Sequence, residues 1–241
     1  AAFACDTEWH RLPAAVQERG RWILADSIPV IATGMQVAEM KAFVETSLAD
    51  RAPGTAWVLG TGRRADPLDA ALINGTAGTW LELDEGNQFA KGHPGIQVVP
   101  AALAVAQAMC ASGTQLLLSV VIGYEICARI SRASKVRLDV HPHGTYGVIG
   151  AAVAVGRLKG FSRKQMRELI NVAATMGMAT SRNSLLEGAT VRNIYTGHAG
   201  LMGQMAVRAV ECGFTGERDG VGSIYGGIIS DEIDRERVIQ R

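Results

Sequence analysis

The sequence is poor in aromatic residues and carries almost no net charge. Phe, Trp and Tyr make up 5% of its 241 residues, and 24 basic side chains face 23 acidic ones, for a formal charge of +1. Nucleic acids and anionic membranes select basic faces and runs of Lys and Arg, which are missing here. Because 48% of the residues are hydrophobic, the chain can still bury a sizeable core. These values predict a soluble globular protein without a nucleic-acid partner.

Cysteine motifs and a targeting segment are also missing. The four cysteines form no C-x-x-C pair and have no histidine at ligand spacing beside them. This pattern predicts no zinc or iron–sulfur site and favours buried free thiols in a reducing compartment. The first residues show no basic leader followed by a long apolar segment, so the expected location is cytoplasmic.

One long stretch without Asp, Glu, Lys or Arg lies between His93 and Glu125. Pro100 is predicted to be a first helical residue, and residues 112–114 (SGT) to end one helix and cap the next. Each resulting helix is shorter than the roughly 20 residues that cross a bilayer. We therefore expect two buried core helices and no membrane span.

Apolar periodicity predicts a chain made mostly of helices. Pro29 is expected to kink or end the first of them, and one strand is predicted over residues 56–59. Helix starts are predicted at Asp66 and at the capping box that begins with Ser162, and a helix stop at Gly213. The predicted helices cover residues 12–32, 36–48, 67–83, 101–111, 115–131, 146–158, 163–176 and 197–211. The fold class is therefore all-α, a single domain over residues 1–241 with at most one or two short strands.

Glycine is abundant, with 28 residues. With few aromatics, so many glycines favour closely packed helices or backbone-lined pockets over a β-sandwich. Small residues at close spacing in 147–154 and 197–203 predict tight helix packing or a subunit interface.

Residues 60–65 (GTGRRA) superficially match a dinucleotide-binding fingerprint, with Glu82 about 20 residues further on. A dinucleotide site needs a second parallel strand that carries the acidic residue, whereas Glu82 is predicted at the end of a helix. A tight strand-to-helix turn explains the glycines, so no dinucleotide cofactor is predicted.

Polar residues gather in three segments that precede Gly- and Ala-rich helices. They are residues 82–94 (ELDEGNQFAKGHP), 140–145 (VHPHGT) and 190–195 (TVRNIY). A surface loop would explain the first segment alone, but the three together suggest a site. Arg binds a carboxylate through two hydrogen bonds, helix N-termini favour anions, and His exchanges protons near neutrality. This chemistry suits a small polycarboxylate.

In these segments the sequence resembles the MmgE/PrpD family. The resemblance rests on residues 60–64 (GTGRR), 67–75 (PLDAALING), 92–94 (GHP) and 141–150, and it continues in the same order to 213–216 (GFTG). The family includes 2-methylcitrate dehydratase, cis-aconitate decarboxylase and iminodisuccinate epimerase. The resemblance implies a large helical domain that carries most of the site, a smaller α+β lid domain, a homodimer, and no metal or organic cofactor in most members. The lid is not among the predicted elements, so residues 1–241 are expected to be the helical N-terminal part of a longer two-domain chain.

The resemblance also implies roles for single residues. His93 and His141 match the two site histidines, Arg192 falls where many members have Lys, and Tyr195 falls where many have His. Glu82, Asp84 and Glu85 fall on an acidic D-x-D-D run. The expected catalytic residues are His93, His141, Asp84 and Glu85, and the expected substrate-binding residues are Arg192, Lys91, Glu82, Tyr195 and His143.

Three departures from the family pattern concern the acidic turn. Glu82 replaces the first Asp, Gly86 stands where Thr is usual, and the turn between Asp84 and His93 is one residue longer than in the decarboxylase. They change the side chains beside the reacting group and leave the particular reaction open.

The expected function is that of a cofactor-independent lyase acting on a small di- or tricarboxylate. A proton next to a carboxylate is weakly acidic, so the site must supply a base and stabilise an enediolate. His93 or His141 would exchange the proton, Arg192 with Lys91 would bind carboxylates, and Asp84 or Glu85 would orient an imidazole or bind a substrate hydroxyl. Dehydration of the 2-methylcitrate type is the leading reaction.

Two alternatives remain. Epimerisation and decarboxylation use the same residue types. A non-catalytic module that binds a carboxylate or only dimerises would be favoured if His93 and His141 lay far apart or in separate cores.

Overall fold

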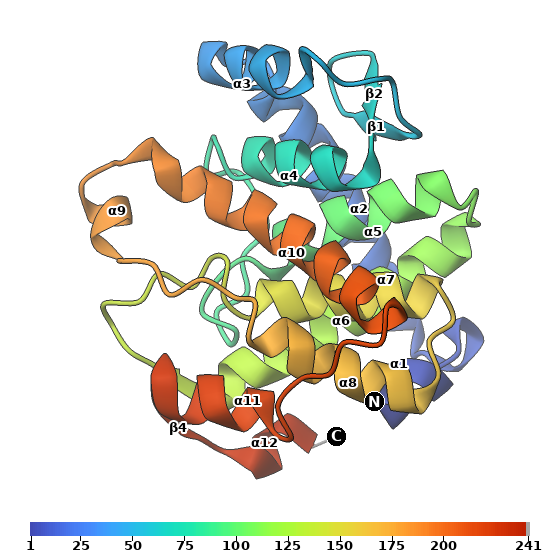
Figure 1. Cartoon of the computed structure of the whole chain (residues 1–241), viewed down its shortest axis with the longest axis vertical. Helices are drawn as coiled ribbons and strands as arrows, with labels where there is room; N and C mark the ends of the chain where they lie inside the picture. The colour runs from blue at the N-terminus through green and yellow to red at the C-terminus, as the bar shows by residue number, and fades with distance from the viewer. Residues whose placement is uncertain (240–241) are drawn as a thin grey trace.

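The computed structural model describes residues 1–239 and is predominantly helical (Figure 1). Its longer helices are α2 (Ala14–Gly34), α3 (Ala38–Leu48), α4 (Pro67–Gly78), α5 (Pro94–Ala108), α6 (Gly113–Ala133), α7 (Gly147–Leu158), α8 (Arg163–Ala174) and α10 (Ile194–Glu211). The short ones are α1 (Ala2–Asp6), η1 (Trp9–Arg11), α9 (Asn183–Leu186), η2 (Thr190–Asn193), α11 (Gly220–Ser223), η3 (Ile224–Ile228) and α12 (Arg235–Ile239). The predicted all-α class is confirmed.

Four short strands form two antiparallel pairs within the described residues. Strand β1 (Ala56–Val58) pairs with β2 (Arg63–Ala65), and β3 (Ser134–Val136) pairs with β4 (Ser230–Ile233). Only β1 was predicted, from the apolar run at 56–59; the other three strands are polar and too short to show a period. The turn at 60–62 joins β1 to β2, so the expected strand-to-helix turn is wrong. Since β2 is antiparallel, this hairpin also lacks the parallel strand of a dinucleotide site.

Helices α5 and α7 form the centre of the bundle because they are apolar on every side. All residues of 94–106 in α5 and of 147–156 in α7 are buried. Helices α4, α6, α8 and α10 pack around them, and α10 crosses α7 in Figure 1. A second, smaller core joins the end of α2 to α3, α4 and the β1–β2 hairpin.

Two prolines lie inside helices, and for Pro100, which was predicted to be a first helical residue, this is contrary to expectation. Helix α5 begins at Pro94 and contains Pro100, and α2 continues past Pro29 to Gly34. An interior proline costs about 3 kcal/mol because it removes a hydrogen bond and crowds the preceding turn. Burial of almost the whole of α5 offsets that cost, so tertiary packing outweighs the local preference here.

The predicted helix caps are confirmed. Ser112 and Ser162 each form a capping box at the start of α6 and α8, and Asp66 caps α4. Gly213 follows α10 with φ 89°. Within residues 1–239, every helix is too short or too polar to cross a membrane.

The cysteines only partly follow expectation. All four are free, but Cys127 alone is buried, whereas Cys110 and Cys212 are exposed and Cys5 is half-buried. The prediction of buried thiols is therefore wrong for the exposed pair, which lie just beyond the ends of α5 and α10.

Tight packing between α4 and α10 depends on glycine. A Cβ on Gly197 would lie 2.2 Å from the Leu72 carbonyl oxygen and 2.4 Å from Thr76 Oγ1. A Cβ on Gly75 would lie 2.7 Å from the Gly197 Cα. The expected close helix packing is confirmed for this part of 197–203.

Gly197→Ala is therefore expected to lower the free energy of unfolding by at least about 1–3 kcal/mol, the usual cost of overpacking. Gly113→Ala is the matched control, because a Cβ there meets nothing within 4 Å. It should stay within about 0.5 kcal/mol of wild type. Urea unfolding followed by circular dichroism measures both variants, and equal midpoints would contradict the close contact.

Candidate active site

Three imidazoles lie side by side in what we call the histidine row: His93, His143 and His141. The ring centroids of His93 and His143 are 5.1 Å apart, and those of His143 and His141 are 4.7 Å apart. Tyr195 continues the row, with its ring 5.5 Å from that of His141. The three polar segments therefore meet in space, and His93 and His141 do not lie in separate cores, the arrangement that would have favoured a non-catalytic module.

The loop after α4 brings His93 to the row. Helix α4 ends at Gly78, earlier than the predicted 83, so the acidic residues lie in irregular backbone. Glu82 and Lys91 have φ values of 55° and 52°. An antiparallel bridge between Asn87 and Gly92 closes the loop with backbone hydrogen bonds of 2.8 and 3.3 Å. This turn returns the chain to His93, the N-cap residue of α5.

Asp84 lies against the His93 ring. Asp84 Oδ2 is 3.0 Å from His93 Nδ1, and the two side chains are 1% and 30% exposed, respectively. The contact with Asp84 raises the pKa of His93 to about 9, although burial works in the opposite direction. At neutral pH His93 therefore carries a proton and can act as a cation or a proton donor.

His141 is held in the opposite protonation state. Its Nδ1 accepts a hydrogen bond of 3.1 Å from the backbone N–H of His143, which assigns the ring proton to Nε2. Burial, reinforced by the charges of Arg192 and Arg182, lowers the pKa of His141 to about 4. Its Nε2 is buried and has no hydrogen-bond partner among the described residues. A neutral His141 thus has an unused N–H donor.

His143 separates the other two rings. His143 is only 4% exposed. Burial, together with the charges of His141 and His93, lowers the pKa of His143 well below 6.5. Its Nδ1 also lacks a partner within residues 1–239. The row therefore places a neutral imidazole between a protonated and a second neutral one.

Arg192 lies in η2 and forms an ion pair with Glu82. The Arg192 side chain is 12% exposed and that of Glu82 is 49% exposed, so the carboxylate covers the guanidinium from the solvent side. The charge of Arg192 also reaches His141, whose pKa it lowers. A buried guanidinium beside the row is suited to bind a carboxylate through two hydrogen bonds.

Arg182 is a second cation near His141 that the sequence did not reveal. The backbone N–H of His141 donates to Thr180 at 2.8 Å, and that of Arg182 donates to Asp139 at 2.7 Å. This pairing places Arg182 diagonally across from His141, within reach of a long side chain. No local motif marks Arg182, because the pairing joins segments about 40 residues apart.

The hydrogen bonds of Glu85 lie outside the histidine row, although its charge helps to raise the pKa of His93. Glu85 accepts hydrogen bonds from the Gly95 N–H in the first turn of α5 and, at 3.1 Å, from the Tyr124 hydroxyl. Burial raises the pKa of Glu85. Lys91 is exposed and has no ion pair within the described part of the chain. The sequence did not reveal Tyr124 either, which contacts this loop from α6.

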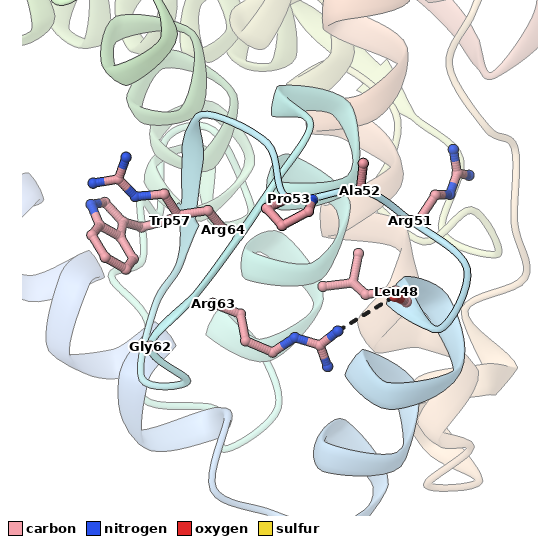
Figure 2. Close-up of a pocket in the computed structure, with 8 residues that line it drawn as sticks. All are labelled: Leu48, Arg51, Ala52, Pro53, Trp57, Gly62, Arg63 and Arg64. Atoms are coloured by element: carbon pink, nitrogen blue, oxygen red, sulfur yellow. Dashed lines mark hydrogen bonds between the residues drawn. The ribbon is translucent and has the colours of Figure 1, made fainter.

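Other places for a ligand are less suitable. A cleft of about 340 Å³ lies between α3 and the β1–β2 hairpin, and its lining includes none of the histidine row (Figure 2). Its arginines already have partners. Arg63 donates to Glu45 at 3.0 Å and to the Leu48 carbonyl at 3.4 Å, and Arg64 stacks on Trp57 at 4.2 Å. No group of three or more His, Cys, Asp or Glu within residues 1–239 is arranged to hold a metal ion.

Comparison with known proteins identifies the family of this helical domain. The chain matches the MmgE/PrpD N-terminal domain over residues 1–228. The chain therefore belongs to the MmgE/PrpD family, as the sequence resemblance predicted.

Several curated relatives are cis-aconitate decarboxylases. That of Aspergillus terreus is 25% identical over 227 residues, covering 90% of this chain and 46% of the relative. That of Mus musculus is 25% identical over 243 residues, covering 93% and 48%. A cis-aconitate decarboxylase-like protein of Aspergillus oryzae is 26% identical over 234 residues, covering 91% and 47%. The chain spans about half the length of the curated relatives it matches.

Proposed function

We propose that this chain carries the acid–base site of a lyase that acts on a small di- or tricarboxylate. The observation that carries the proposal is the pairing of a protonated His93 with a neutral His141 in one row, beside the guanidinium of Arg192. Family membership and the cis-aconitate decarboxylase relatives support the same class of reaction. The homodimer and the cytoplasmic location stay predictions.

Decarboxylation is the reaction that these protonation states favour. The bond between the departing carboxylate and its neighbouring carbon breaks, CO₂ leaves, and the electron pair stays on that carbon. The His93 proton then moves to the carbon, and His93 regains a proton from solvent. Arg192 and Arg182 bind the remaining carboxylates, while the His141 Nε2–H donates to the oxygen on which negative charge develops.

Dehydration, the leading reaction from sequence, is the second candidate. It needs a base that removes a proton, and His93 is already protonated at neutral pH because of Asp84. His143 is neutral but nearly inaccessible. Dehydration and epimerisation therefore rank below decarboxylation.

The test uses the complete natural gene product that contains this chain, because the matched relatives are about twice as long. It is incubated in D₂O with cis-aconitate, 2-methylcitrate, tartrate and iminodisuccinate, and products are followed by NMR. CO₂ release with one deuteron on the product carbon indicates decarboxylation, loss of water indicates dehydration, and a deuteron on a carbon of inverted configuration indicates epimerisation. If no acid reacts or exchanges, the lyase proposal is overturned in favour of a carboxylate-binding module.

His93→Gln and His141→Gln are each expected to lower kcat by at least about 100-fold, the usual contribution of a general acid or base. His93→Gln should also lower the melting temperature, because the buried Asp84 carboxylate loses its charged partner, so kcat is measured well below the unfolding midpoint of each variant. His10→Gln is the control, because His10 is an exposed histidine outside the row. Unchanged turnover in both row variants would place the chemistry elsewhere.

A further inference from the structure

Gln97 is a fully buried glutamine whose side chain joins two segments of the histidine row. It lies in α5, one helical turn after His93. Its Nε2 donates to the His93 carbonyl oxygen at 3.0 Å, and its Oε1 accepts from the Gly144 N–H at 2.9 Å. One side chain therefore connects the backbone that carries His93 to the backbone directly after His143.

The surroundings confine the Gln97 amide. A Cβ on Gly147 would lie 2.2 Å from Gln97 Oε1, so the start of α7 leaves room for this amide and no more. Gly144 has φ 79°, a conformation that favours glycine, and its carbonyl accepts from the Met178 N–H at 2.8 Å. Because one end donates and the other accepts, the amide can adopt only one orientation.

A buried glutamine can also be a simple core residue, and α10 provides an example for comparison. Gln204 is buried and donates one hydrogen bond of 2.8 Å to the Pro67 carbonyl. Gln97 differs because both of its ends are bonded and both partners adjoin histidines of the row. The loss of Gln97 should therefore change the geometry of the row, whereas the loss of Gln204 should change stability only.

We propose that Gln97 is a positioning residue that holds the His93 and His143 rings in place through their backbones, and that turnover depends on its two hydrogen bonds. Gln97 does not touch the substrate. The kinetic part of this inference rests on the proposed function, whereas its structural part does not.

The experiment compares Gln97→Met, Gln97→Glu and the control Gln204→Met in the complete gene product, with cis-aconitate as the probe. Gln97→Met loses both hydrogen bonds, and we expect kcat to fall at least about 10-fold while KM changes less than about 3-fold. Gln97→Glu is the conservative variant, because a protonated carboxylic acid can donate to the His93 carbonyl and accept from the Gly144 N–H. We therefore expect Gln97→Glu to keep near wild-type kcat at pH 5 and to lose it as the buried carboxyl ionises.

Histidine NMR titration separates this inference from the proposed function. In Gln97→Met the His93 pKa should fall below its wild-type value, because the ring moves away from Asp84; in Gln204→Met it should not change. If the wild type turns over no acid, the proposed function fails and the titration alone decides. An unchanged His93 pKa, or an equal loss of kcat in Gln97→Met and Gln204→Met, overturns the role of Gln97. If Gln97→Met does not fold, Gln97→Glu serves as the test variant. The positioning role of Gln97 is then overturned if the ratio of kcat in Gln97→Glu to kcat in wild type does not change with pH.

Discussion

Asp84→Asn is expected to lower the pKa of His93 from about 9 to about 6.5 or below. The contact with Asp84 is the main cause of the raised value, and the burial that opposes it remains in the variant. His93 would then be largely neutral at physiological pH and could not deliver a proton. We expect kcat at pH 7.5 to fall about 10-fold, and the alkaline limb of the pH profile, near pH 9 in wild type, to move to about pH 6.5.

Proton NMR of the His93 ring measures this pKa directly, and a pH series of kcat measures its consequence. Asp69→Asn is the control, because Asp69 is a partly buried carboxylate that pairs with Arg51 on another face. A His93 pKa that stays near 9 in Asp84→Asn would show that Asp84 does not set the protonation state of the row.

The same contact makes stability depend on pH. The pKa of His93 is raised above its unfolded value of 6.5, so the stabilisation is fully present below pH 6.5 and is lost as pH rises through about 9. The difference in unfolding free energy between wild type and Asp84→Asn should therefore be largest in acid and shrink at alkaline pH. Urea unfolding at pH 6 and at pH 9.5 tests the sign.

The sequence was a better guide to which residues lie together than to their protonation states. His93 and His141 could be found because each stands in a His-Pro pair before a Gly- and Ala-rich helix, and because both match a family motif. The sequence could not predict their protonation states. These depend on Asp84 beside the His93 ring and on the His143 N–H that donates to the His141 ring. A reaction that needs a proton donor and a reaction that needs a base can use the same residues, so residue types alone do not distinguish them.

Contacts between distant segments were the other part that the sequence did not reveal. The Glu82–Arg192 pair joins residues 110 positions apart, and Gln97 reaches Gly144 over 47 positions. Helix caps at Ser112 and Ser162 were predicted because a cap is local. By contrast, the proline inside α5 was misjudged because its cost is offset by packing that no local pattern encodes.

Arg192→Met is expected to lower kcat/KM by about 100- to 1,000-fold, mostly by raising KM. The guanidinium is nearly buried, and truncation of one partner of a buried, hydrogen-bonded charge pair typically costs about 2–5 kcal/mol. Removing its charge should also raise the pKa of His141 above about 4, because Arg192 is one cause of the low value. Arg192→Lys keeps the charge but cannot form the bidentate hydrogen bonds of a guanidinium, so we expect an intermediate loss of kcat/KM. Arg167→Met, at an exposed position on α8, is the control.

Glu82→Gln then distinguishes two roles for the ion pair. The Glu82 carboxylate already pairs with the guanidinium that a substrate carboxylate would need. If Glu82 is a competitor that substrate displaces, Glu82→Gln should lower KM for cis-aconitate while Arg192→Met raises it. If Glu82 orients Arg192, both variants should raise KM. Calorimetric titration of cis-aconitate at pH 7.5 gives the same comparison without turnover, and unchanged binding in Arg192→Met would show that the pair only stabilises the fold.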